Sequence, residues 1–443
     1  MRYYLDPFGC AKNQVDAENM MAYLNNADWS AAADAADADI IIVNSCGFIE
    51  SAKKESINAV LLWRRLYPTK KILMSGCLAQ RYAEELAESL NEADGFFGTE
   101  DISKITGAVH SLFKKTVSLP TTHYPLSTFS RPLLSLPGSA YVKISEGCDN
   151  CCTFCAIPLI RGPLRCRAVA DIVQECEGLL ARGIKELCII GQDIGSYRYR
   201  GFGLPELLNA IAELPGDFWV RLLYIHPDHF PLPILDLMEK DPRFLPYFDI
   251  PFQHSSDKIL HTMNRHGTAE KYIALVKTIK NRLPAAVIRS TFLVGFPGET
   301  DADFASLLDF QEKLNLDWLG CFSYSREEGT PAYTMKGRVS QKTAAARKRE
   351  IEERQSLITE KNMDRFVGRN FDVLLEERFH SDGDAEDGEL WLGRLYCHAP
   401  EVDGTAVITG EGNGRETAGN ILPCVVIARR GIDLEVRING AGQ

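Results

Sequence analysis

The sequence predicts an α/β protein of three parts: an N-terminal parallel-sheet α/β domain, a central partial (βα)6 barrel and a small C-terminal β-barrel. At 443 residues the chain is too long for one ordinary domain. Short apolar runs alternate with helical patterns through the first two parts, which is typical of βα units. After residue 366 the pattern changes to short strands with Gly and Asp turns.

The N-terminal part, residues 1–120, contains four apolar runs that we interpret as parallel strands. They are separated by about thirty residues each, the spacing expected when a helix joins successive parallel strands. The runs are Tyr3–Leu5, Ile40–Val43, Ile72–Met74 and Gly95–Phe97. A stretch containing Pro and Ser follows with weak periodicity, so we expect residues 121–138 to be a linker.

The central part, residues 139–365, contains six apolar runs with helical patterns between them. The runs are Tyr141–Ile144, Glu186–Ile190, Trp219–Tyr224, Phe248–Ile250, Val287–Val294 and Trp318–Phe322. Six repeats indicate an open, partial barrel, because a closed barrel of this kind has eight. The charged stretch Gln341–Met363 ends this part, and we expect its charges to form a solvated helix face.

The C-terminal part, residues 366–436, is predicted to be a β-barrel of about five strands. Its apolar runs are Phe371–Glu377, Leu390–Tyr396, Thr405–Ile408 and Ile421–Ile438, the last interrupted by Gly431. Residues 367–443 carry 7 basic and 14 acidic side chains, a net charge of −7, within a chain of net charge −11. This acidity argues against a general nucleic-acid binder, which would present basic surfaces to phosphate.

We expect the chain to be cytoplasmic. Its first residues lack the apolar core of a signal peptide, and no apolar run approaches the roughly 18 residues of a membrane span. Because the cytosol is reducing, the 13 cysteines are expected to bind metal or serve catalysis rather than form disulfides.

The segment Cys148-Asp-Asn-Cys-Cys-Thr-Phe-Cys155 is the sharpest chemical signal. Cys148, Cys152 and Cys155 directly follow the first strand of the central part. Three thiolates from one loop can hold three irons of a four-iron cluster, which leaves the fourth iron open to a ligand. The alternative is a zinc loop, but zinc usually requires a fourth protein ligand and no histidine lies nearby. We expect Cys151 and Cys166 to be bystanders.

Cys10, Cys46 and Cys77 form a second trio, since each lies a few residues after an N-terminal strand. The carboxyl ends of parallel strands face one crevice, so the three thiols should converge there. Each cysteine adjoins a glycine that would let the backbone approach a bulky cofactor. The alternative is three inert buried cysteines. We predict a second iron–sulfur cluster with three protein ligands.

With these two trios, the segment Gly9-Cys-Ala-Lys-Asn-Gln-Val-Asp16 and the acidic β tail, the chain resembles the methylthiotransferases of the radical S-adenosylmethionine (SAM) superfamily. The likeness covers almost the whole chain in the family's order: methylthiotransferase domain, radical SAM core and TRAM domain. It implies that the central trio holds the [4Fe–4S] cluster that binds SAM. It also implies that the N-terminal trio holds an auxiliary [4Fe–4S] cluster.

The resemblance also indicates where SAM would bind. Gly191, Gln192 and Asp193 follow the second barrel strand, where superfamily members bind the SAM amino group. Gly295 follows the fifth strand, near the expected ribose and adenine. Both turns lie at the carboxyl ends of strands, the usual catalytic face of such folds. Taken alone, each segment is better explained as an ordinary strand-to-helix turn, and it is their position relative to the cysteine loop that favours SAM binding.

Three arginines follow the cysteine loop and are further candidates for binding. Arg161, Arg165 and Arg167 could each pair with the carboxylate of SAM or of the substrate. Ion pairs within the protein would explain each of them equally well. The sequence does not decide between these uses.

The family has two branches with different substrates. One thiomethylates an isopentenylated adenosine in transfer RNA, and the other thiomethylates the β-carbon of an aspartate in small-subunit ribosomal protein twelve. The segments 10–18 and 250–257 resemble the protein-modifying branch, and an acidic tail suits a basic ribosomal protein better than RNA. The transfer-RNA substrate stays an alternative, as does a different class, an iron–sulfur scaffold or electron carrier. The resemblance implies two further partners, an electron donor of flavodoxin or ferredoxin type and a sulfur source, and no membrane.

Overall fold

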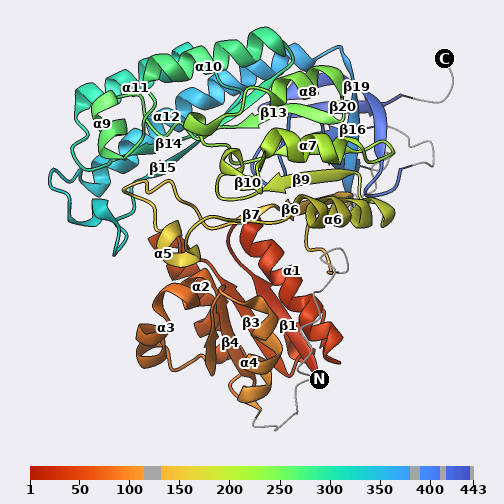
Figure 1. Cartoon of the computed structure of the whole chain (residues 1–443), viewed down its shortest axis with the longest axis vertical. Coiled ribbons are helices and arrows are strands. Elements are labelled where there is room, and N and C mark those ends of the chain that lie inside the picture. Colours follow the sequence, from red (N-terminus) through yellow and green to blue (C-terminus); the bar gives the residue numbers. More distant parts are fainter. Residues whose placement is uncertain (114–130, 380–389, 410–415, 440–443) are drawn as a thin grey trace, which may run out of the picture.

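The computed structural model describes residues 1–113, 131–379, 390–409 and 416–439. Figure 1 shows two bodies, with the N-terminal domain below and the barrel and C-terminal β unit above. The predicted fold class is confirmed in all three parts. Within the described ranges, no helix has both the length and the apolar character that crossing a membrane requires.

The N-terminal domain is a five-stranded parallel sheet in the order β2-β1-β3-β4-β5. Its strands are β1 (Arg2–Pro7), β2 (Ser30–Ala31), β3 (Ile40–Ser45), β4 (Lys71–Gly76) and β5 (Gly95–Phe97). Its helices are α1 (Ala11–Asn26), α2 (Glu50–Leu66), α3 (Cys77–Ser89) and α4 (Ile105–Leu112). Ile40 and Ile42 pack into the apolar cluster on one face, whereas Ile41 and Val43 pack into the cluster on the other. Helices therefore cover both faces, as in other parallel sheets.

The central domain is an open six-stranded parallel sheet in the order β15-β14-β13-β12-β9-β6. Its strands are β6 (Ser139–Lys143), β9 (Glu186–Ile190), β12 (Trp219–Leu222), β13 (Phe244–Asp249), β14 (Val287–Val294) and β15 (Trp318–Ser323). Its helices are α5 (Ile157–Arg161), α6 (Val169–Ala181), α7 (Leu204–Ala212), α8 (Ile234–Lys240), α9 (Asp257–Thr262), α10 (Ala269–Arg282), α11 (Asp301–Leu314) and α12 (Gln341–Met363). Two short antiparallel pairs join β7 (Ser145–Glu146) to β8 (Arg165–Cys166), across the cysteine loop, and β10 (Arg198–Tyr199) to β11 (Phe202–Gly203).

Helix α12 departs from the expectation of a purely solvated charged face. Arg347 is buried and donates to the Glu299 carboxylate at 2.9 Å. Gln355 and Thr359 are also buried, and Thr359 Oγ1 donates to the Asp317 carbonyl oxygen at 2.7 Å. One polar stripe of the helix therefore faces the barrel, and only the rest is solvated.

The C-terminal domain is a closed barrel of five strands in the order β16-β17-β18-β20-β19. Its strands are β16 (Asn370–Phe379), β17 (Leu390–Arg394), β18 (Ala406–Ile408), β19 (Ile421–Arg430) and β20 (Asp433–Ile438). Gly431, with a φ of +63°, makes the turn between the last two. Apolar side chains of this domain form one cluster with barrel residues such as Tyr141, Trp219, Tyr247 and Trp318, so the C-terminal domain packs directly on the central sheet.

The predicted linker, residues 121–138, lies outside the described residues up to position 130. Its remaining part is anchored by Arg131, which is buried and pairs with Glu18 of α1 and Glu175 of α6. Elsewhere between the two bodies, Lys53 of α2 donates to the Glu327 carboxylate at 2.9 Å. The N-terminal domain is therefore held against the barrel by ion pairs at several separate places.

Candidate active site

The three N-terminal cysteines lie at the carboxyl ends of three adjacent strands. Cys10 is the N-cap residue of α1, Cys46 directly follows β3, and Cys77 begins α3. A Cβ added to Gly9 would lie 3.2 Å from the Cβ of Cys46, and one added to Gly47 would lie 2.7 Å from the carbonyl oxygen of Cys77. The glycines thus let the three cysteine loops pack against one another. That they also let the backbone approach a cofactor stays a prediction.

Cationic side chains surround this trio. Burial disfavours the Cys10 thiolate, but the nearby charges of Lys12 and Arg161 outweigh it and lower the pKa of Cys10. Burial raises the pKa of Cys77 to about 12, although Arg161 Nη2 donates to its sulfur at 3.0 Å. Because iron binds thiolates, bound metal would have to supply the remaining stabilisation of the Cys77 anion.

The central trio lies on the loop that follows β7. The backbone N–H of Cys155 donates to the Cys152 carbonyl oxygen at 3.0 Å, and that of Cys148 donates to the Gly162 carbonyl oxygen at 3.2 Å. Burial raises the pKa of Cys148 to about 11 and that of Cys155 to about 12, and neighbouring thiols contribute to both shifts. The three sulfurs are therefore near enough to interact, on a loop of defined shape.

The donor chemistry of both trios fits iron–sulfur clusters. All 13 cysteines are free thiols. Among the described residues, no three Cys, His, Asp or Glu side chains are arranged around a single metal ion. A four-iron cluster does not require this, because each thiolate binds a different iron. Cys151 is exposed, and the sulfur of Cys166 accepts from the Arg198 backbone N–H at 3.3 Å. Within the described residues, neither side chain is hydrogen-bonded to a cysteine of the central trio.

Asp193 is the centre of a hydrogen-bond network beside the central trio. Its carboxylate accepts from Asn150 Nδ2 (2.9 Å), Gly195 N (3.0 Å), Ser196 Oγ (2.6 Å), His226 N (3.0 Å) and His229 Nδ1 (2.8 Å). Burial alone would raise the pKa of Asp193, but these donors outweigh it and hold the pKa well below its usual range. Asp193 therefore ties the cysteine loop, through Asn150, to the ends of β9 and β12, and both of its oxygens have partners.

The other candidate SAM residues differ in what they offer a ligand. Gln192 donates from Nε2 to the Glu146 carboxylate at 3.0 Å, while its Oε1 is buried without a hydrogen-bond partner. This unpaired acceptor fits a ligand that carries an ammonium group. Gly191 packs closely on its surroundings, since an added Cβ would lie 2.7 Å from Ser145 Oγ. Gly295 has a φ of +77°, and its N–H donates to the Glu299 carboxylate.

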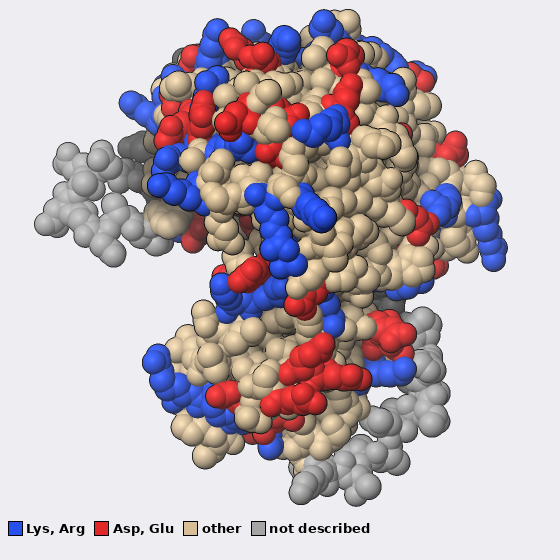
Figure 2. Space-filling model, turned by 90° about the vertical axis from the view of Figure 1, so that its left-hand side faces the viewer, with Lys and Arg blue, Asp and Glu red and all other residues tan. Residues whose placement is uncertain are grey.

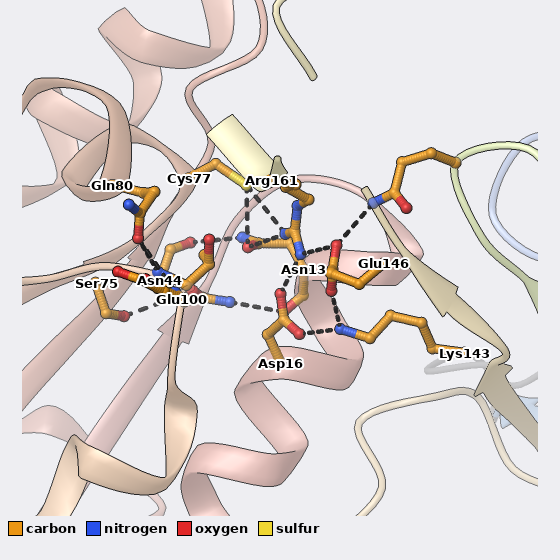
Figure 3. A network of polar contacts seen from close by, with 12 residues as sticks. Asn13, Asp16, Asn44, Ser75, Cys77, Gln80, Glu100, Lys143, Glu146 and Arg161 are labelled. Carbon is orange, nitrogen blue, oxygen red and sulfur yellow. Dashed lines mark hydrogen bonds and ion pairs between the residues drawn. The ribbon is translucent and has the colours of Figure 1, made fainter. Parts of the chain in front are cut away.

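A buried network of polar side chains links Cys77 of the N-terminal trio to the central domain (Figure 3). Arg161 Nη1 donates to Asp16 Oδ2 at 2.7 Å and to Glu146 Oε1 at 2.9 Å, and its Nη2 donates to the Cys77 sulfur. Lys143 of β6 donates to the carboxylates of both Asp16 and Glu146, and the distance from its Nζ to Glu146 Oε2 is 2.6 Å. Figure 2 shows basic and acidic side chains gathered at the hollowed waist between the two bodies. Contacts therefore run from Cys77 to Glu146, which in turn binds Gln192.

The three candidate arginines all have partners within the protein. Arg167 pairs with Glu175 at 2.5 Å, and Arg165 Nη2 donates to the Arg161 carbonyl oxygen at 3.4 Å. The alternative use, as ion pairs of the protein, is displayed by Arg161 and Arg167, whereas Arg165 has a backbone partner. Sequence reasoning missed Asp16, although this polar residue lies within the segment that begins at Cys10.

Comparison with known proteins supports the division into three parts. Residues 2–98 match the model of the uncharacterized protein family UPF0004, residues 142–310 match the radical SAM superfamily, and residues 367–438 match the TRAM domain. The radical SAM methyltransferase TsrM from Kitasatospora setae has a similar fold, with a TM-score of 0.54, 15% identity and coverage of 75% of this chain and 76% of that one. The cobalamin-dependent radical SAM enzyme OxsB aligns with a TM-score of 0.51, 12% identity and coverage of 80% and 56%.

The open parallel barrel with its three-cysteine loop, matched by the superfamily model, defines a radical SAM enzyme with a TRAM domain. A [4Fe–4S] cluster and SAM are therefore among its cofactors. The chain is 46% identical to the ribosomal protein uS12 methylthiotransferase RimO of Treponema denticola, over 97% of this chain and 99% of that one. It is 40% identical to the RimO of Thermosipho africanus, with coverage of 93% and 94%. The chain belongs to the RimO family of radical SAM methylthiotransferases.

Proposed function

We propose that this enzyme transfers a methylthio group to the β-carbon of an aspartate in ribosomal protein uS12, small-subunit ribosomal protein twelve. The observation that carries this proposal is the 46% identity to a uS12 methylthiotransferase over nearly the full length of both chains. The acidic C-terminal part supports it, because opposite charge favours a basic ribosomal protein over phosphate.

We assign the six cysteines to two [4Fe–4S] clusters. Cys148, Cys152 and Cys155 would hold the cluster that binds SAM, and the trio of Cys10, Cys46 and Cys77 would hold an auxiliary cluster. When bound and reduced, the cluster of the central trio would supply the electron that cleaves SAM to methionine and a 5′-deoxyadenosyl radical, which is able to remove hydrogen from carbon. The convergence of the N-terminal trio and the hydrogen bond from Arg161, just past the central cysteine loop, to the Cys77 sulfur support this assignment.

The chain's own residues hold the parts of the site in place. Asp193 and Asn150 fix the cysteine loop against the barrel. Gln192 supplies a buried acceptor on the SAM side, and the glycines 191 and 295 allow close packing there. We infer domain limits of 1–120, 139–365 and 366–436, and two further partners, an electron donor of flavodoxin or ferredoxin type and a sulfur source.

Mass spectrometry of uS12 and of transfer RNA tests the proposed substrate. Holoenzyme with SAM, reductant and a sulfur source should add a methylthio group to an aspartate of uS12 and leave transfer RNA unchanged. A methylthio group found only on a transfer-RNA adenosine would contradict the proposed substrate but leave the proposed radical SAM chemistry intact. Absence of 5′-deoxyadenosine in the same reaction would instead favour an electron carrier.

A further inference from the structure

Lys12 is a largely buried cation whose ammonium has no hydrogen-bond acceptor among the described residues. It lies in the first turn of α1, two residues after Cys10, and its exposed fraction is 9%. Its ammonium lies over the ring of Tyr224, 3.3 Å from the ring centroid. Within the described part of the chain, its Nζ makes neither a hydrogen bond nor an ion pair. A cation–π contact offsets part of the cost of burial, but the three N–H donors of the ammonium still lack acceptors.

The position of Lys12 connects the two halves of the site. The residue beneath its ammonium, Tyr224, follows β12 and has a φ of +68°. The Tyr224 carbonyl oxygen accepts from the N–H of Ile194 at 3.1 Å, one residue beyond Asp193. Lys12 therefore extends from the helix that begins at Cys10 to the end of a barrel strand tied to the central cysteine loop.

The charged groups around Lys12 leave its donors free. The Cys10 thiolate and Asp249, at the end of β13, both interact with it electrostatically, but no carboxylate oxygen of the described residues lies within the 4.0 Å of an ion pair. Arg161, the nearby cation, is paired with Asp16 and Glu146. A ligand with oxygen acceptors would supply the hydrogen bonds that the described residues do not give the ammonium.

We propose that Lys12 binds the side-chain carboxylate of the substrate aspartate and so holds its β-carbon at the barrel mouth between the two cysteine trios. This inference rests on the proposed function. A carboxylate supplies acceptors for charge-assisted hydrogen bonds. Its carbon is bonded directly to the β-carbon, so an anchor there fixes the reacting atom and leaves its hydrogens accessible. SAM also carries a carboxylate, and the test below separates the two sources.

The test compares binding of holoenzyme to uS12 and to uS12 in which the target aspartate is changed to asparagine, which has nearly the same shape without charge. The wild-type enzyme should prefer the aspartate form roughly ten- to hundredfold, the size of a lost charge-assisted hydrogen bond. Lys12→Met removes the charge from a side chain of similar length, so this variant should bind both forms alike. Lys54→Met, at an exposed lysine of α2, should keep the wild-type preference.

Three results would overturn the inference. Equal binding of both uS12 forms by the wild-type enzyme would overturn the inference. This comparison needs no enzyme variant, so it holds even if the Lys12→Met protein folds poorly. An undiminished preference in Lys12→Met would overturn it as well. Weaker SAM binding in Lys12→Met, with the preference retained, would assign the lysine to SAM. No binding of uS12 by the wild-type enzyme would instead overturn the proposed function.

Discussion

Arg161 belongs to both halves of the site at once. It ends the short helix α5 after the central cysteine loop, yet it donates to the Cys77 sulfur and to Asp16 of the N-terminal domain. A buried ion pair adds little net stability compared with apolar packing. Its partners do define one geometry, so Arg161 fixes how the N-terminal domain meets the segment after the central cysteine loop more than it stabilises the fold.

Alanine variants of the two cysteine trios should lose the same amount of iron but differ in SAM cleavage. Changing Cys148, Cys152 and Cys155 to alanine should leave about four of about eight irons and abolish 5′-deoxyadenosine formation. The same change in the N-terminal trio should also halve the iron, but SAM cleavage should persist without methylthio transfer. Iron assay and product chromatography on anaerobically reconstituted protein measure both. Methylthio transfer by the second variant would mean that those cysteines are inert core residues.

The sequence predicted the residues that repeat a local pattern and missed those defined by distant contacts. Cys10 and Cys77 could be grouped because each follows a strand, and parallel strands end at one edge. The partners of Arg161 could not be predicted, since Asp16 lies 145 residues away in the chain. For Asp193 the sequence located the site, but its five hydrogen bonds come from three separate segments, which only the fold brings together.

At the scale of elements, most strands follow their apolar runs, and β13 shows why one did not. The run Phe248–Ile250 was predicted, whereas the strand spans Phe244–Asp249 and contains Pro246. Proline donates no hydrogen bond and is rare in a central strand, so the sequence argued against this position. The structure accommodates it with a register shift in the neighbouring pairing, between Val220 and Leu222 of β12.

Gly47 controls how the loops after β3 and β4 meet, so Gly47→Ala should disturb the N-terminal trio alone. The added methyl would lie 2.7 Å from the Cys77 carbonyl oxygen, and backbone must move to relieve that contact. Reconstituted Gly47→Ala should lose up to half of its iron while retaining SAM cleavage. Gly320→Ala in β15 is the control, because its methyl would meet Arg289 Nη2 at an ordinary 3.5 Å. Full iron content in Gly47→Ala would show that the trio tolerates separated loops.

At the scale of the whole molecule, a buried charge network joins the barrel to the TRAM domain. Glu186 of β9 accepts from Arg221 at 2.7 Å and from Arg394 of β17 at 2.5 Å. Arg394 also donates to Glu376 at 2.6 Å. Removing the TRAM domain would leave Glu186 and Arg221 without this partner and expose the apolar side chains beneath it. The domain is therefore part of the fold and is better probed by single substitutions than by deletion.

Glu186→Gln should lower the free energy of unfolding by about 3–5 kcal/mol at pH 7, because it leaves two buried arginines short of a carboxylate. Burial alone would raise the pKa of Glu186, but Arg394 and Arg221 outweigh it and hold the pKa well below its usual range. The stabilisation is thus fully present above the unfolded pKa of about 4.3 and is lost as pH falls below it. Urea unfolding at a series of pH values should show the variant's deficit shrinking in acid. Glu213→Gln, at an exposed site, should change little at any pH.

The charge of the TRAM domain should govern how the enzyme meets uS12. Five of its 14 acidic side chains lie within residues 380–389, outside the described ranges, while Asp372, Glu377 and Glu401 are exposed on the described surface. Neutralising these three together should weaken uS12 binding and flatten its dependence on salt, since exposed charges are screened over about 8 Å at physiological ionic strength. Titrations from low to high salt measure this, with an equal neutralisation at three exposed sites of the central domain as the control, at Glu213, Asp217 and Glu270. If both triple variants weaken binding equally, only overall charge matters; if neither does, uS12 is recognised without the acidic tail.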